Sequence, residues 1–442
     1  MLGWNCFLAK SVFANDPTTL PLLHSSDIVY LGSFKIPRPV LGSDSVSFDY
    51  GGMGLAISAN GKNLYVAGHV YYQTLGEIAI PNSFGDTATL VKAPVGIPGS
   101  IGGSCGSSIE ISGALVFNNR LIVQKRCYND NEGDIGYTHA AGTLDLNEFT
   151  PFSRLANLPY KQYASGYMGI IPLEWQNLLG GPAFTGNGIM GISSQCSHGP
   201  TFYVFNPNDV GKTSLIPSIP LMYFPYGNEL SNPKIANDLF SESDQSNAGM
   251  IFPSGTRSVL FVNRHGHGNP TYNVDDGCGG KNGYGAKPYR RQITAFDAND
   301  LLAVKNGTKL PYAIRPYEWW VVPGPTDSCA GFTYSGLAYD PITRKVYMAL
   351  GYNDNPVIHV WQVKDPTTRI KTVHPLLESG IHLVCTVFNT HGQEVAKIQG
   401  LQGNESDILE LAKVEKTLPK GIYLYRLKGK GISFTIKKTL MK

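Results

Sequence analysis

Ionisable side chains that could bind a ligand or catalyse a reaction cluster in a few short, turn-like segments of this 442-residue chain. Six of the ten histidines lie in or beside these segments, together with arginines, carboxylates and tyrosines. Such groups form sites for sugars, anions and metal ions, although loops are also polar simply because they face water. The candidate ligand-binding residues are His69, Arg126, Asp130, His198, Arg264, His265, His267, Tyr272 and Asp354.

Three further carboxylates, Asp49, Glu110 and Asp244, each precede an apolar, strand-like run. Glycoside hydrolysis needs two carboxyl groups about 5 Å or about 6.5–9.5 Å apart across the sugar. Carboxylates from separate strands could meet that condition if the strands converge. Such residues also serve as hydrogen-bonded plugs of a channel, so both interpretations stay open.

Two kinds of metal site are compatible with the sequence. His265 and His267 are one residue apart, so an extended segment places both imidazoles on one side, and His69 or His198 could complete a zinc site. The segment DNEGD (130–134) resembles the start of a calcium loop, but no glutamate stands at the twelfth position. Solvated turn carboxylates are the alternative. No HExxH or P-loop pattern occurs, and nothing indicates a nucleotide cofactor.

An internal repeat indicates how these distant segments could meet. The runs GLAISANGKNLYVAGH (54–69) and GLAYDPITRKVYMALG (336–351) share residues at matched offsets, and looser copies lie between them. Each copy gives a glycine-led apolar strand, a turn and a second strand, followed by a third and usually a fourth strand. We therefore predict an all-β, five-bladed β-propeller spanning 28–363. The predicted blades are 49–97, 104–158, 162–228, 245–323 and 332–363.

The last repeat lacks a fourth strand, and residues 28–37 near the chain start supply one of the right type. We predict that this N-terminal strand completes the last blade and removes an exposed edge. In such a ring, the loops between second and third strands gather at one mouth of the central channel. The candidate ligand-binding residues would then share that mouth.

Four cysteines fall at the same predicted end of the propeller. We predict the disulfides Cys105–Cys127 and Cys278–Cys329, with Cys196 as an alternative partner in the first pair. Disulfides form in oxidising compartments, so these pairs would place the chain outside the cytoplasm.

The charge, the hydropathy and the N-terminal residues bear on the partners and the location of the protein. A formal net charge of +3 gives no electrostatic reason to expect nucleic acid as a partner. No apolar run approaches the roughly 20 residues needed to span a bilayer, so no transmembrane segment is expected. Residues 1–27 are interpreted as the remnant of a secretory signal or a plain N-terminal extension.

Residues 364–442 form a different domain, for which short strands predict a small Ig-like β-sandwich. The segments VFNTHGQEV (387–395), LPKGIYLYRL (418–427) and FTIKKTLMK (434–442) resemble the C-terminal sorting domain of type IX secretion cargo from Bacteroidota-like bacteria. The usual Pro-Asn-Pro of that family is absent. The resemblance implies recognition by the type IX secretion machinery and release or anchorage at the cell surface.

The segments FDYGGMGLA (48–56), LFVNRHGHG (260–268) and YRRQITAFDANDLLAVKNG (289–307) resemble a family of secreted bacterial propeller proteins. This resemblance implies fold and export but names no reaction. We therefore expect an exported propeller that presents a binding face for glycan or another extracellular polymer. The alternatives are a glycoside or metal-dependent hydrolase, and a self-assembling structural component. Carboxylates in an open channel would favour a hydrolase, whereas a plugged channel with exposed tyrosines would favour binding.

Overall fold

The computed structural model shows an all-β chain that divides into two compact units, residues 1–368 and 369–442. The structure describes residues 16–38, 46–105, 109–127, 136–159, 161–188, 197–230, 239, 245–266, 268, 271–272, 284–285, 288–324, 334–350, 356–366, 383–388, 393–401, 417–419, 421–429 and 432–440.

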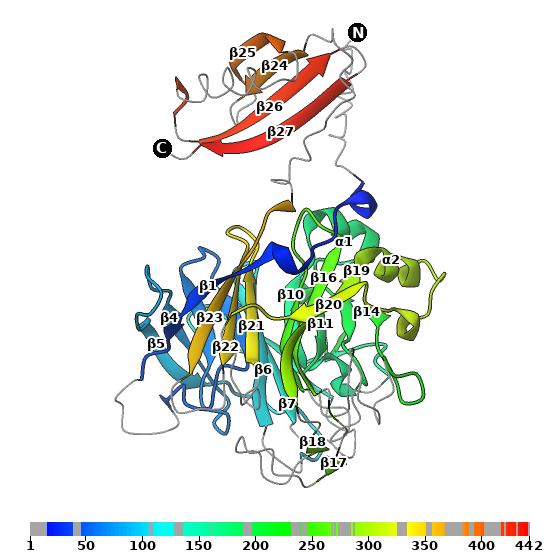
Figure 1. Cartoon of the computed structure of the whole chain (residues 1–442). Coiled ribbons are helices and arrows are strands. Elements are labelled where there is room, and N and C mark those ends of the chain that lie inside the picture. Colours follow the sequence, from blue (N-terminus) through cyan, green and yellow to red (C-terminus); the bar gives the residue numbers. More distant parts are fainter. Residues whose placement is uncertain are drawn as a thin grey trace, which may run out of the picture. The chain divides into compact units, whose positions relative to one another are not determined.

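The strands of the first unit form a five-bladed β-propeller (Figure 1). Blade one contains β2 (Leu55–Ile57), β3 (Asn63–Ala67), β4 (Thr74–Ala79) and β5 (Thr89–Gly96). Blade two contains β6 (Ile109–Phe117), β7 (Arg120–Cys127) and β8 (His139–Gly142). Blade three contains β10 (Gly166–Ile170), β11 (Ala183–Asn187), β12 (Phe202–Phe205) and β14 (Ser218–Met222). Blade four contains β15 (Gln245–Ile251), β16 (Ser258–Gly266), β19 (Tyr289–Asp297) and β20 (Glu318–Val321). Blade five contains β21 (Tyr334–Asp340), β22 (Lys345–Leu350), β23 (Val357–Val363) and β1 (Ile28–Lys35).

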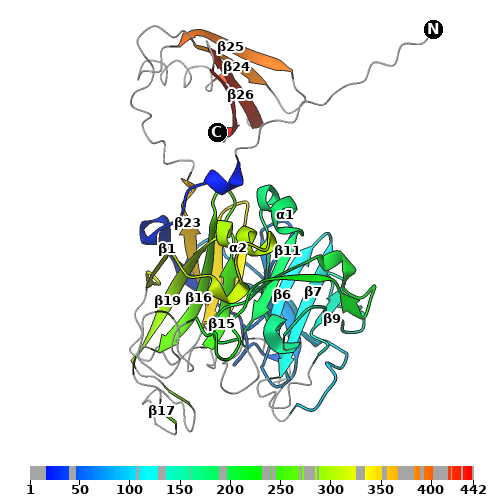
Figure 2. The ribbon, with the colours of Figure 1, turned by 90° about the vertical axis from the view of Figure 1, so that its right-hand side faces the viewer.

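Short elements decorate the blades. Two-residue strands are β9 (Arg154–Leu155), β13 (Leu215–Ile216), β17 (Thr271–Tyr272) and β18 (Tyr284–Gly285). The helices are α1 (Leu173–Leu179) and α2 (Ala298–Lys305), with 3₁₀ turns at Pro17–Thr19, Ser25–Asp27, Lys161–Ala164, Pro207–Asp209 and Pro311–Ala313. Both helices lie at one end of the propeller and β17 at the other, as the two views agree (Figures 1 and 2). We call these ends the helix face and the hairpin face.

The innermost strands β2, β6, β10, β15 and β21 each contact the innermost strands of two neighbouring blades, so they form a closed ring around the axis. The glycine that begins each repeat fits this crowding. A Cβ atom at Gly336 would lie 2.3 Å from the carbonyl oxygen of Gly52, and one at Gly54 would lie 3.0 Å from Ile111. The repeated glycines therefore let neighbouring blades approach near the axis.

The N-terminal strand β1 pairs antiparallel with β23 over its whole length, from Ile28 opposite Val363 to Lys35 opposite Val357. The pairing continues beyond the strands, because the amide of Lys364 donates to the carbonyl oxygen of Asp27 at 2.8 Å. β1 is thus the outer strand of blade five. The strand covers an edge that β23 would otherwise present to solvent.

The prediction that residues 152–159 form the fourth strand of blade two is wrong. The short strand β9 in this stretch pairs in parallel with β13 rather than with β8. The amides of Arg154 and Ala156 donate to the carbonyl oxygens of Ser214 and Ile216. The backbone of Arg154 and Ala156 is therefore bonded to the outer part of blade three, and a single isolated bridge, between Ser153 and His139, joins the segment to β8.

The second unit contains one antiparallel sheet in the order β25-β24-β26-β27. Its strands are β24 (Leu383–Phe388), β25 (Glu394–Leu401), β26 (Gly421–Gly429) and β27 (Ile432–Leu440). Cys385 on β24 is a buried free thiol. The predicted sandwich needs a second sheet, which the described residues of this unit do not include.

Candidate functional site

The described candidate residues lie where strands end at the hairpin face. Second strands place most of them: Arg126 is the penultimate residue of β7, Arg264 and His265 close β16, and His69 follows β3 by two residues. His198 lies in the segment that leads into β12. Asp130, Asp244, His267 and Asp354 lie outside the described residues, as does the side chain of Tyr272 in β17.

An ion pair between Glu110 and Arg126 is enclosed at the hairpin-face end of blade two. The Nε and Nη2 atoms of Arg126 each lie 2.9 Å from Oε2 of Glu110, and both side chains are at most 2 % exposed. The Nη1 atom donates to the carbonyl oxygen of Gly188, and Nη2 lies 3.5 Å from the sulfur of Met53. Arg126 therefore joins blade two to segments of blades one and three.

Glu110 and Asp49, the two candidate catalytic carboxylates that the structure describes, each pair with an arginine. Glu110 is fully buried, and its Oε1 atom has no hydrogen-bond partner among the described residues. Asp49 pairs with Arg38, whose Nη2 lies 3.1 Å from its Oδ2 atom. A general acid or base must come within hydrogen-bonding reach of substrate. Glu110 is buried away from solvent, so it agrees with the second interpretation from the sequence, a hydrogen-bonded residue that plugs the channel.

Three tyrosines surround His69 on the hairpin face, and we call Tyr50, Tyr71 and Tyr72 the tyrosine cluster. Their ring centroids lie 5.6, 5.5 and 5.1 Å from that of His69. The histidine is 8 % exposed, whereas the tyrosines are 38, 66 and 45 % exposed, in the same order. A buried imidazole thus holds three rings that face water. The two adjacent tyrosines are visible in the loop sequence His-Val-Tyr-Tyr, but of this loop the sequence analysis named only the histidine as a candidate.

A local turn fixes the geometry of the tyrosine cluster. The amide of Tyr72 donates to the carbonyl oxygen of His69 at 3.0 Å, and the amide of Tyr71 donates to its Nδ1 atom at 3.4 Å. The amide of His69 donates in turn to the carbonyl oxygen of Ser47. The loop after β3 is therefore tied to the segment that precedes β2, which carries Tyr50.

Further aromatic contacts involve the other candidate residues. The ring of His198 lies 6.0 Å from that of Tyr226, which is 74 % exposed. The guanidinium carbon of Arg264 lies 4.0 Å from the ring centroid of Tyr289. Cation–π geometry of this kind holds an arginine against an aromatic face. The hairpin face therefore combines exposed tyrosine rings with buried cationic and imidazole groups.

The described residues do not support a metal centre. No three His, Cys, Asp or Glu side chains gather within the part of the chain that the structure describes. His265 is fully buried, and both His267 and the acidic segment 130–134 lie outside the described residues. His139 is buried against Gln124 and Thr138, and burial lowers the pKa of its imidazole to about 3. The His139 ring is therefore a neutral part of the core.

The predicted disulfide between Cys105 and Cys127 is confirmed, with its Cα atoms 5.7 Å apart. The bond ties the segment before β6 to the end of β7, directly beside Arg126. Cys278 and Cys329 lie outside the described residues. Among the helices of the described chain, none has the length and apolar character needed to cross a bilayer.

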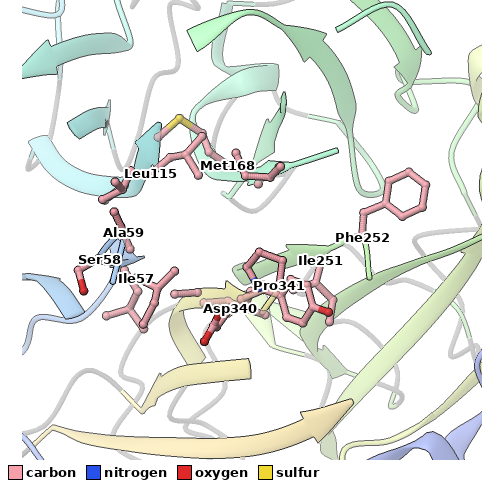
Figure 3. Close-up of a pocket in the computed structure, with 18 of the residues that line it drawn as sticks. Ile57, Ser58, Ala59, Leu115, Met168, Ile251, Phe252, Asp340 and Pro341 are labelled. Carbon is pink, nitrogen blue, oxygen red and sulfur yellow. The ribbon is translucent and has the colours of Figure 1, made fainter. Parts of the chain in front are cut away.

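A pocket of about 280 Å³ opens at the opposite end of the propeller, on the helix face (Figure 3). We call it the helix-face pocket. All five blades line it through the ends of their innermost strands. The sequence prediction missed this pocket, although the repeated apolar runs GLAIS, GALVF, YMGII, GMIFP and GLAYD are the segments that form it.

Comparison with known proteins gives weak likenesses. No protein family matches the chain, and no curated protein matches it. Among solved structures, PorZ, a surface component of the type IX secretion system of Porphyromonas gingivalis, aligns at 10 % identity and a TM-score of 0.30, covering 88 % of this chain and 52 % of that one. The chain thus spans about half the length of PorZ.

Two other solved structures align at similar levels. A glycosyl hydrolase from Bacteroides ovatus shows 12 % identity and a TM-score of 0.38, over 77 % of this chain and 92 % of that one. The β-propeller domain of Cps50 (Swd1) from Myceliophteria thermophila shows 9 % identity and a TM-score of 0.28, over 71 % and 82 %. Likenesses at this level carry no conclusion about what the chain binds or catalyses.

Proposed function

We propose that this protein is an exported β-propeller that binds glycan or another extracellular polymer through the tyrosine cluster on its hairpin face. The observation that carries the proposal is the group of three water-facing rings held around His69. The enclosed Glu110–Arg126 pair on the same face supports binding over catalysis, because it leaves Glu110 without access to a substrate.

Tyrosine rings suit the recognition of sugars. Each ring offers a flat apolar surface for the C–H face of a sugar, while its hydroxyl group can exchange hydrogen bonds with the sugar hydroxyls. A tyrosine side chain also loses little conformational entropy on binding, because only two torsions are fixed. Three such rings around one buried imidazole form a semi-rigid surface that could contact neighbouring residues of a polymer.

The proposed location is the cell surface or the extracellular space of a Bacteroidota-like bacterium. The Cys105–Cys127 disulfide supports an oxidising compartment. We further propose that residues 28–363 act as the binding domain, that residues 1–27 precede it as an extension, and that residues 364–442 form an Ig-like sorting domain recognised by the type IX secretion machinery. The sorting-domain resemblance of residues 387–395, 418–427 and 434–442 supports that assignment.

A glycan-array screen of the full chain, followed by calorimetric titration of the glycans that bind, tests the proposal. Replacing Tyr71 or Tyr72 by alanine should each weaken binding by roughly tenfold, because an aromatic contact contributes about 0.5–1.5 kcal/mol beyond its buried area. Phe84→Ala is the matched control, since Phe84 and Tyr72 are both 45 % exposed and Phe84 lies in the β4–β5 turn at the helix face. It should bind like the wild type.

Two results would contradict this function. Glycan binding that is unchanged in both tyrosine variants would place the site elsewhere on the molecule. A screen with no binder, together with concentration-dependent assembly in light scattering, would favour a structural component instead.

A further inference from the structure

We propose that the helix-face pocket is a second binding site, which takes a compact, uncharged and largely apolar molecule of about eleven non-hydrogen atoms. It lies at the end of the propeller opposite the tyrosine cluster, so it is independent of the proposed polymer-binding function.

The walls of the pocket are apolar because the last residues of the innermost strands that line it are mostly apolar. Leu115 of β6 and Met168 of β10 line one side, and Ile57 of β2 and Ile251 of β15 line the other (Figure 3). Phe252, which directly follows β15, also lines the pocket, and its ring packs against Trp175. A water molecule in such a space finds few hydrogen-bonding partners, so an apolar ligand gains by replacing it.

At the rim, polar side chains stand at the ends of the first strands and in the turns that follow them. Ser58, Asn118 and Asn119 come from blades one and two, and Asp340 comes from blade five. The carboxylate of Asp340 accepts hydrogen bonds from the amide of Ile342 at 2.9 Å and from Oγ1 of Thr343 at 2.5 Å. The described residues that line the pocket include no basic side chain. This charge pattern disfavours an anionic ligand, whereas a hydroxyl group can find partners at the rim.

The volume sets the size of the ligand. An apolar cavity of about 150 Å³ holds benzene, which has six carbon atoms. By the same ratio, the 280 Å³ of this pocket corresponds to about eleven non-hydrogen atoms. Burying a charge among apolar walls without a partner is strongly unfavourable, so the ligand should be neutral. A naphthol or a medium-chain alcohol has the required size and polarity.

Calorimetric titration of the full chain with 2-naphthol and with 1-decanol tests the proposal. We expect saturable binding of at least one of them at one site per chain. Decanoate, which differs from decanol in its charged end, should bind at least about tenfold more weakly, and glucose, a polar molecule of similar size, should not bind.

Pocket-filling variants locate the site. Ile57→Trp and Val116→Trp introduce an indole at two half-buried positions on different blades, and each should raise the dissociation constant by about tenfold or more. Val91→Trp is the control, because Val91 lies on β5 away from the pocket and is 50 % exposed. Circular dichroism establishes that each variant is folded. One folded filling variant is sufficient to locate the site, if the other does not fold.

The proposal is overturned if neither probe binds, or if a folded filling variant binds as tightly as the Val91→Trp control. Decanoate that binds as tightly as decanol would overturn the assigned charge preference. Tyr71→Ala should leave probe binding unchanged, so a failure of this site is distinguishable from a failure of the polymer-binding site.

Discussion

The Glu110–Arg126 pair gives the sharpest test of the channel plug, because removing one partner leaves the other charge buried. Glu110→Gln keeps the shape of the side chain but removes its charge. Arg126 would then remain 2 % exposed without the carboxylate that its Nε and Nη2 atoms now contact at 2.9 Å. Breaking a buried pair by removing one partner typically destabilises a protein by about 3–5 kcal/mol. We therefore expect Glu110→Gln to lower the free energy of unfolding by about 3 kcal/mol or more.

The double replacement Glu110→Leu/Arg126→Met separates the cost of an unpaired charge from the contribution of the pair itself. Apolar residues of similar volume often replace a buried ion pair without loss of stability. The double variant should therefore be more stable than Glu110→Gln. Asp49→Asn is the matched control, because its arginine partner, Arg38, is 54 % exposed. An exposed pair contributes about 0–1 kcal/mol, so this variant should change stability little.

Urea unfolding followed by tryptophan fluorescence measures these changes in the full chain. Four of the five tryptophans lie within residues 28–363 and none lies in residues 364–442, so the signal reports mainly on the propeller and not on the C-terminal unit. If Glu110→Gln unfolds within about 0.5 kcal/mol of the wild type, which is the usual range for surface substitutions, the plug is refuted. Retained binding of glycan by this variant would agree with a structural role, whereas a hydrolase would lose activity without losing stability.

Acid should destabilise the propeller, because burial lowers the pKa of His139 to about 3 and that of His359 to about 4. In the unfolded chain these histidines bind protons as the pH falls below about 6.5, whereas in the folded chain they stay neutral. The free energy of unfolding is therefore highest above that pH and decreases below it, by up to about 1.4 kcal/mol per pH unit for His139. Urea midpoints that stay level from pH 7 to pH 4.5 would contradict this. The Cys105–Cys127 disulfide closes a loop with a sequence separation of 22 residues. The Cys105→Ser/Cys127→Ser variant should lose about 3 kcal/mol, and an unchanged urea midpoint would show that the bond does not constrain the unfolded chain.

The blade pattern was predictable because it depends on local chemistry repeated along the chain. A glycine where innermost strands meet, an apolar strand and a turn recur in each unit, and each signal lies within about fifteen residues. The prediction for blade two failed because hydrogen bonds from Arg154 and Ala156 to residues of blade three redirect its last segment. No local pattern in residues 152–159 reveals a partner that lies 60 residues away.

The candidate site was predictable in part. Histidine and arginine side chains stood out in the sequence, and the described ones do lie at the hairpin face. Their burial could not be read from the sequence, since a loop histidine such as His69 reads the same whether it faces water or supports three tyrosines. For Glu110, the sequence left a catalytic acid and a channel plug open as alternatives, and the enclosing arginine favours the plug.

The sequence by itself indicated the all-β class and the number of repeats, because periodicity and residue type act over short distances. It left Cys196 open as a partner in the first cysteine pair, and the structure selects Cys105–Cys127. Only the tertiary structure decided which polar groups are enclosed, which aromatic rings face water and that apolar strand ends leave a pocket at the helix face. Those properties depend on how five blades pack around one axis. Burial and cavities arise from contacts between residues far apart in the chain, which no single segment encodes.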